Sequence, residues 1–141
     1  MAKQLGRALL VKIGDGEASE AFANLCGLNS KSLTINNSAI DVTTPDCTTP
    51  EGALWTETLA GLKNVSVTGD GFFEDSTTES RMNSVAMNAD SKANFQIVLP
   101  DFGTYAGAFR ITSLEFGGET EGGVTYSLSL ESTGAVTFTA V

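Results

Sequence analysis

The sequence predicts a mainly β protein: an antiparallel β-sandwich or barrel of about eight strands with one flanking α-helix. Apolar residues recur at every second position wherever the chain is apolar, which is typical of strands with one buried face. The segments between them are rich in Gly, Asn, Asp, Ser and Thr, the residues that favour turns. Residues 76–89 carry apolar side chains at helical spacing over two turns, which predicts the helix.

The first half of the chain is interpreted as two hairpins and a further strand. Residues 9–13 alternate up to the turn dipeptide Asp15-Gly16, and residues 22–25 form the return strand. The apolar pairs at 33–35 and 40–42 flank the polar stretch 36–38, which predicts a second hairpin. Val65 and Val67 then alternate up to Gly69-Asp70-Gly71, where two glycines predict a bulge or a close backbone approach.

The second half begins with the predicted helix. Ser76 and Glu79 form a capping-box pattern at its start, and its apolar face is Met82, Val85, Ala86 and Ala89. Strands follow at 95–99, 105–116, 124–131 and 136–138. The apolar residues of the second of these change parity after Ile111, so we expect a bulge near Thr112 and Ser113 that keeps Leu114 and Phe116 inside.

Length and composition bound the function. The 141 residues suit one domain that covers the whole chain, 1–141. No apolar run approaches the roughly 18 residues of a membrane span, and Lys12 interrupts the apolar segment that a secretory signal would need, so we expect neither membrane insertion nor export. The two cysteines are interpreted as free thiols in a reducing cytosol, and Cys26 as a core residue.

Charge and the absence of histidine exclude several chemistries. A formal net charge of −9 disfavours any nucleic-acid binding that works by neutralising phosphates. Without histidine, Ser-His-Asp and Cys-His catalysis and most zinc sites are removed, so we expect no enzyme and no cofactor. Glu74, Asp75 and Glu79 cluster at the predicted helix start, where the helix dipole stabilises them, so we expect no metal site.

Trp55, the only tryptophan, has two interpretations. With Leu59 it forms an i, i+4 pair on a short helical turn that begins at Thr49-Pro50 and ends at Gly61. Because Trp is highly buried on average, the favoured interpretation is that it plugs one end of the sandwich. The alternative is that it anchors the chain on a partner surface.

The order of these segments resembles the major tail tube proteins of long, flexible-tailed bacteriophages and of related gene transfer agents. The likeness runs from about Leu9 to Val141. It rests on IDVTT followed by Trp and LAG, on SVTGDGFFED before the helix, and on PDFG, a G-x-F strand, SLE and the closing YSLSLESTG. None of these is a catalytic signature, so the match is one of pattern and order.

The resemblance implies a structural virion protein that self-assembles. Six copies would form a homohexameric ring, and stacked rings would form a tail tube that conducts DNA without binding it specifically. Its partners would be the tape-measure protein, the tail terminator and the baseplate or distal tail proteins, and assembly would occur in the host bacterial cytoplasm. The alternative that the fold permits is a β-sandwich recognition module, carbohydrate-binding or adhesin-like.

The resemblance also implies where subunits meet. An N-terminal arm would comprise about residues 1–7, and an inter-subunit loop about residues 43–52, mobile in the monomer and fixed in the tube. The candidate loop residues are Thr43, Thr44, Pro45, Asp46, Cys47, Thr48, Thr49 and Pro50. An acidic lumen would repel DNA phosphates; its candidate residues are Asp41, Glu115 and Glu131, and the competing interpretation is an acidic outer surface that maintains solubility.

Overall fold

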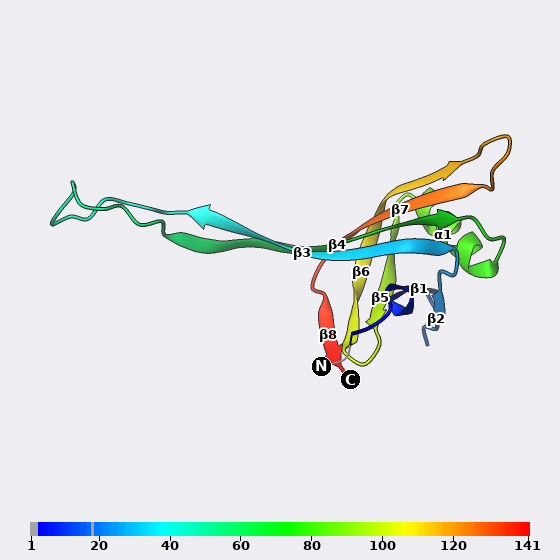
Figure 1. The fold of residues 1–141 in the computed structure, drawn as a ribbon. Coiled ribbons are helices and arrows are strands. Elements are labelled where there is room, and N and C mark those ends of the chain that lie inside the picture. Colours follow the sequence, from blue (N-terminus) through cyan, green and yellow to red (C-terminus); the bar gives the residue numbers. More distant parts are fainter. Residues whose placement is uncertain (1–2, 18) are drawn as a thin grey trace.

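A computed structural model describes residues 3–17 and 19–141, which form eight strands, one α-helix and a short 3-10 helix (Figure 1). Residues 1 and 2 of the predicted N-terminal arm lie outside this part. The element bounds are η1 Gly6–Ala8, β1 Leu10–Gly14, β2 Phe22–Asn24, β3 Leu28–Asp41, β4 Thr58–Phe72, α1 Thr77–Met87, β5 Lys92–Leu99, β6 Gly103–Gly117, β7 Thr125–Ser132 and β8 Thr137–Ala140.

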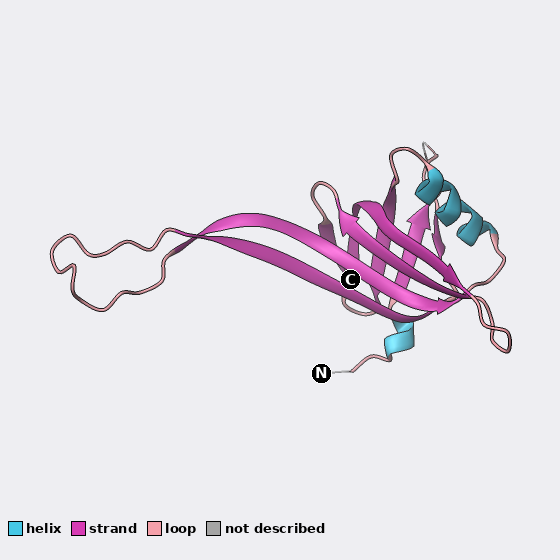
Figure 2. Cartoon of the chain, turned by 90° about the horizontal axis from the view of Figure 1, so that it is seen from above, coloured by secondary structure: helices cyan, strands magenta, loops and turns pink. Residues whose placement is uncertain are grey.

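The strands form one curled antiparallel sheet in the order β2-β1-β5-β6-β7-β4-β3, with β8 beside the first half of β6. This confirms the predicted fold class. The predicted first hairpin, β1 with β2, is also confirmed, since Ile13 pairs with Ala23. Figure 2 shows α1 packed at one end of the strands, where it contacts β1, β5 and β6.

The core occupies the face of the sheet that α1 covers. Phe95 and Phe109, both 0% exposed, meet edge to face with ring centroids 6.0 Å apart. Alternate residues of each central strand join them, because successive side chains of a strand point to opposite faces. The buried set includes Val11, Ile13, Val65, Val67, Ile97, Ile111, Tyr126, Leu128 and Leu130 from the strands and Met82 and Val85 from the helix.

The helix begins where the sequence predicts and ends earlier. The Oγ of Ser76 accepts a 3.3 Å hydrogen bond from the backbone N–H of Glu79, which satisfies one of the free donors at the helix start. The Glu79 carboxylate accepts a hydrogen bond from the Tyr126 hydroxyl in the core, and it does not complete the predicted capping box with the Ser76 backbone N–H. The predicted helical face is wrong at Ala89, which is exposed and follows the last helical residue, Met87.

The predicted bulge in β6 is confirmed. The register of β6 against β7 shifts between Ile111 and Ser113, so Ile111 and Leu114 can both face the core. The bulge does not bury Phe116 as predicted: its side chain is 46% exposed.

Gly71 is the close approach that the Gly69-Asp70-Gly71 pattern predicts. A Cβ at Gly71 would overlap the carbonyl oxygen of Gly27, so only glycine lets the two backbones come together. The register shift itself lies on the partner strand, between Leu28 and Ser30 of β3.

The predicted second hairpin is wrong. Residues 36–38 do not turn, because β3 runs on through them to Asp41 and pairs Asn36 with Asn64 of β4. β7 pairs with β4 only from Ser66 onward, so beyond this point β3 and β4 continue as a two-stranded ribbon. We call residues 36–64 the arm, which projects far from the rest of the fold in Figure 1.

Candidate functional site

Hydrogen bonds close the loop of the arm at its base. Asp41 Oδ1 accepts hydrogen bonds from the Thr43 backbone N–H at 2.9 Å and from the Thr43 hydroxyl at 2.6 Å. The Thr43 Oγ1 in turn accepts a 2.9 Å bond from the backbone N–H of Glu57. The Thr43 hydroxyl, and then its N–H, lowers the pKa of Asp41 below its usual range. The loop therefore starts from a fixed neck.

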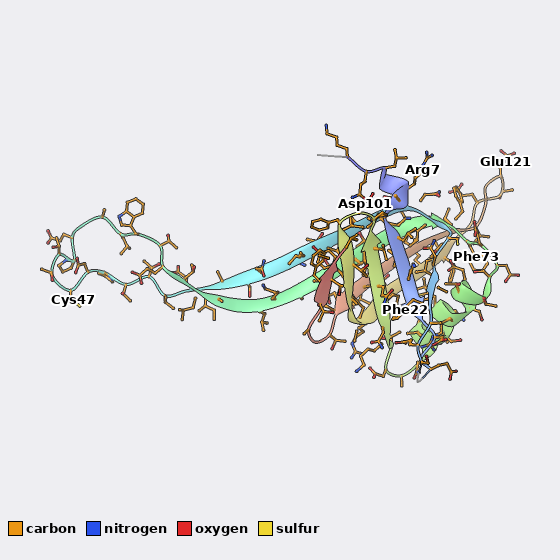
Figure 3. The ribbon with its side chains drawn as sticks, turned by 90° about the horizontal axis from the view of Figure 1, so that it is seen from below. Arg7, Phe22, Cys47, Phe73, Asp101 and Glu121 are labelled. Atoms are coloured by element: carbon orange, nitrogen blue, oxygen red, sulfur yellow. The ribbon has the colours of Figure 1, made fainter. Side chains whose placement is uncertain are left out.

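The predicted inter-subunit loop, 43–52, begins at this neck and extends to the far end of the arm, where Figure 3 labels Cys47. The Asp46 carboxylate accepts a 3.0 Å bond from the Thr48 N–H, and the Gly52 N–H donates to the Thr49 carbonyl at 3.0 Å. These local turns hold the tip together, while its side chains remain exposed.

A β-bulge interrupts the pairing of the two strands near the base of the arm. Gly61 and Leu62 of β4 stand opposite the single residue Ser38, between the pairs Asn37–Lys63 and Ala39–Ala60. The Ser38 Oγ accepts a 2.7 Å bond from the Leu62 N–H and donates a 3.1 Å bond to the Leu62 carbonyl, so one hydroxyl satisfies both backbone groups. Bulges of this kind change the direction of a strand's side chains.

The arm exposes a series of large apolar side chains. Trp55 is 82% exposed and belongs to no helical turn, so the interpretation that it plugs the end of the fold is wrong. A two-stranded ribbon has no buried face, and an alternating pattern there carries no information about burial. The exposed apolar residues of the arm are Ile40, Val42, Leu54, Trp55, Leu59 and Leu62.

The sheet face opposite the core is rich in hydroxyl groups. Cross-strand partners share a face, and three rows of them cross β3, β4, β7 and β6. The rows are Ser30-Asp70-Ser127-Glu115, Ser32-Thr68-Ser129-Ser113 and Thr34-Ser66-Glu131-Arg110. The hydroxyls of Ser32 and Thr68 hydrogen-bond at 2.7 Å. We call these rows the polar sheet face.

The candidate lumen acids separate into two places. Glu115 and Glu131 lie on the polar sheet face, in its first and third rows, whereas Asp41 lies far away on the arm. The sequence interpretation missed Asp70, which shares the row of Glu115. The sequence did contain a signal for its orientation. Asp70 follows Val67 by three residues, an odd number, so a regular strand places its side chain on the face opposite Val65 and Val67.

Both cysteines are free and exposed. The assignment of Cys26 to the core is therefore wrong: its neighbour Leu25 fills the core, while the Cys26 Sγ lies 3.7 Å from the Asn24 carbonyl. Among residues 3–17 and 19–141, no three acidic, Cys or His side chains gather as a metal site would require. No helix in this part of the chain is long and apolar enough to span a membrane.

The family profile described as "Phage tail tube protein" matches residues 3–138, almost the whole chain. The chain belongs to the phage tail tube protein family. Two solved structures agree with this assignment. A subunit from the tail of an empty gene transfer agent particle, refined with C6 symmetry, is 34% identical with a TM-score of 0.86, and the match covers 98% of this chain and 100% of that one.

The second is a chain from the virion of a native gene transfer agent, 31% identical with a TM-score of 0.83, over 98% of this tail tube protein and 100% of that chain. The tail tube of SPP1 shares the fold at 14% identity, with a TM-score of 0.67 over 99% of this chain and 80% of that one. A comparison with curated protein sequences gave no match.

Membership of this family makes the tail tube protein a structural component of the tail of a virion or gene transfer agent particle, and not an enzyme. The resemblance that the sequence motifs indicate is thereby confirmed. The alternative, a carbohydrate-binding or adhesin-like module, has no support from the family match. The functional surfaces of such a protein are those on which it meets other copies of itself.

Proposed function

We propose that six copies of the chain close into a ring and that rings stack into a hollow tube through which DNA passes. The support for sixfold symmetry is the gene transfer agent tail, refined with C6 symmetry, whose subunit is 34% identical over nearly the full length. The ends of such a tube would meet the tape-measure protein, the tail terminator and the baseplate or distal tail proteins.

The arm is the observation that carries this proposal. From Thr58 to Asn64, the edge of β4 that faces β7 elsewhere in the sheet has no partner strand. β3 is the last strand of the sheet, so its outer edge has no partner either, and both edges of the arm offer unpaired backbone groups. Exposed strand edges of this length are rare in monomers because they template pairing with other chains. Pairing with neighbouring copies satisfies these groups and buries the apolar residues of the arm.

The loop 43–52 and the N-terminal segment are the proposed inter-subunit elements. The loop lies at the greatest reach of the chain, and the prolines at 45 and 50 reduce the entropy that it loses when it orders on a neighbour. Residues 3–7 are exposed and precede the first core strand, so they are free to lie on an adjacent copy.

The polar sheet face is the proposed wall of the lumen. It offers hydroxyl groups, three carboxylates and one guanidinium, that of Arg110, which hydrogen-bonds Asp90 at 3.0 Å. The net charge of this face is negative, and the apolar residues lie on the other face of the sheet. The polar sheet face therefore repels DNA phosphates and offers no apolar contact to the bases. Asp70, Glu115 and Glu131 are the acids assigned to this wall, and Asp41 has a structural part in the arm instead.

Negative-stain microscopy of the concentrated wild-type protein tests the proposal. We expect hollow tubes or annular oligomers. Deletion of Thr44 to Thr49 removes the tip beyond the neck and touches no core residue, so the variant should fold with an unchanged circular dichroism spectrum and fail to polymerise. Tubes of normal length from this deletion would refute the assignment of the loop.

A further inference from the structure

The two ends of β6 expose aromatic surfaces. β6 has 15 residues, so its ends are roughly 45 Å apart at about 3.3 Å per residue. Figure 1 shows its first residues beside the C-terminus and β8 at the bottom of the fold, and its last residues in the β6–β7 hairpin at the top. Neither surface belongs to the arm.

At the first end, which we call the basic end, a turn presents Phe102. The Phe102 N–H donates a 3.1 Å bond to the Leu99 carbonyl, and Asp101 adopts a left-handed φ of 62° in this turn. Phe102 is 54% exposed and its ring centroid lies 5.1 Å from that of Phe138, which is itself 43% exposed. The turn therefore forms an apolar projection.

Two basic side chains lie at the same end of the fold as this projection. Leu10, the first residue of β1, pairs with Val98, so the preceding segment with Lys3 and Arg7 lies at the same end as the turn (Figure 3). Lys3 and Arg7 are both exposed. The segments 3–9, 99–103 and 137–141 together contain a single acidic side chain, that of Asp101. This end is the more positive part of a protein whose formal charge is −9.

At the other end, which we call the acidic end, the aromatic residues form a groove. Phe73 and Phe116 meet edge to face at 5.6 Å, and the Phe73 N–H donates a 2.7 Å bond to the Val124 carbonyl. These three side chains line one wall of a groove of about 460 Å³, and the first turns of α1 line the other. All three are between 39% and 50% exposed. The groove is thus an unfilled apolar surface.

Only acids accompany this groove. Residues 72–80 and 115–124 contain no lysine or arginine, and the exposed acids Glu74, Asp75, Glu119 and Glu121 lie in these two segments. Like ends of two copies would repel one another. Unlike ends match, because an apolar projection with cations meets an apolar groove with anions.

We propose that the basic end of one copy docks on the acidic end of a second copy in the next ring. Phe102 enters the groove of Phe73, Phe116 and Val124, and Lys3 and Arg7 face Glu119 and Glu121. The contact is heterologous and does not close, so repetition extends the assembly along one axis. This docking rests on the proposed tube, and it is a contact between rings that is separate from the arm. Because it is repeated around each ring, individually weak contacts add up to a strong one through avidity.

A charge exchange tests the docking. One variant is K3E/R7E and the other is E119K/E121K; all four side chains are exposed, so both variants should keep the wild-type unfolding temperature. Each alone should need at least about tenfold more protein to polymerise, because two charge pairs across an interface rim contribute on the order of a factor of ten. A 1:1 mixture should assemble near the wild-type concentration, because each reversed end meets its complement.

The control E17K places a positive charge on an exposed residue outside the ranges that form the two ends, so it should polymerise like wild type. Polymerisation of E119K/E121K at the wild-type concentration, or failure of the two folded variants to rescue each other, would overturn the docking and leave the proposed tube intact. Failure of the concentrated wild-type protein to form any ring or tube would instead contradict the proposed function.

Discussion

The Tyr126 hydroxyl donates a 3.0 Å hydrogen bond to Oε1 of Glu79, and the two residues are 1% and 5% exposed. The bond joins α1 to β7 through the core. Burial raises the pKa of Glu79 above its usual value and outweighs the opposing effect of the Tyr126 hydrogen bond, while the charge of Glu74 raises the pKa further. Burial therefore makes the neutral carboxyl of Glu79 easier to maintain in the folded protein than it is in water.

A pH dependence follows from this raised pKa. The folded protein holds the Glu79 proton more tightly than the unfolded chain, so the stabilisation is fully present below the unfolded pKa and is lost as pH rises through the folded one. Glu79→Gln should retain it, so the difference in free energy of unfolding between E79Q and wild type should grow from pH 4 to pH 7.5. Urea unfolding across this range measures it, with E17Q as control; parallel profiles for E79Q and wild type would contradict the prediction.

Gly71 should tolerate no side chain. A Cβ there would clash with the backbone carbonyl oxygen of Gly27, which cannot rotate away as a flexible side chain would. Gly71→Ala should therefore cost about 1–3 kcal/mol of unfolding free energy, the usual cost of overpacking. Gly118→Ala is the matched control, because nothing lies within 4 Å of the Cβ position there. Equal stabilities of the two variants would show that the strands separate easily at Gly71.

The neck of the arm should depend on one hydroxyl. Thr43→Val removes the bond to Asp41 and the acceptor for the Glu57 N–H, each worth roughly 1 kcal/mol. Amide exchange of residues 42–57 should become faster by about tenfold or more, while the core retains its protection, because Thr43 lies in the arm and is not part of the core cluster. Thr48→Val is the control, since its backbone N–H still reaches Asp46. Unchanged exchange in T43V would contradict the role of the neck.

Trp55 should matter for assembly and not for folding. The ring is 82% exposed, so Trp55→Ala should change the unfolding free energy by less than about 0.5 kcal/mol. Buried aromatic anchors often contribute about 2 kcal/mol or more to an interface, so the concentration required for tubes should rise at least tenfold. Met87, 80% exposed at the end of α1, supplies the control M87A. Sedimentation of tubes measures both, and normal assembly of W55A would exclude Trp55 from the interface.

The sequence predicts best where local pattern and burial coincide. Strands with one face in the core alternate as expected, so Phe95, Ile97, Leu128 and Leu130 could all be placed correctly. The Ser76 cap and the β6 bulge are likewise local events, which a few neighbouring residues determine. For these elements, the spacing of side chains along the chain is sufficient.

The errors arise where apolar residues are not in the core of the monomer. Trp55, Phe116 and Val124 look like core residues, because the spacing of apolar side chains along the chain is the same whether or not the monomer buries them. The polar residues 36–38 look like a turn, because a ribbon with two exposed faces needs no apolar residue there. The place of Asp70 beside Glu115 depends on which strands are neighbours, and that order is a long-range property.

The arm has a kinetic consequence. A two-stranded ribbon without a core is only marginally stable in water by itself, so before docking the arm should spend part of its time frayed. In the first few subunits, the arm loses conformational entropy on ordering before there is a preformed surface on which it can dock. Subunits that add later order their arms on the end of an existing tube. We therefore expect polymerisation to show a lag phase that sheared tube fragments, added as seeds, abolish. The position and the time at which a tube starts would then be determined by the complex that nucleates it, and not by the subunit alone.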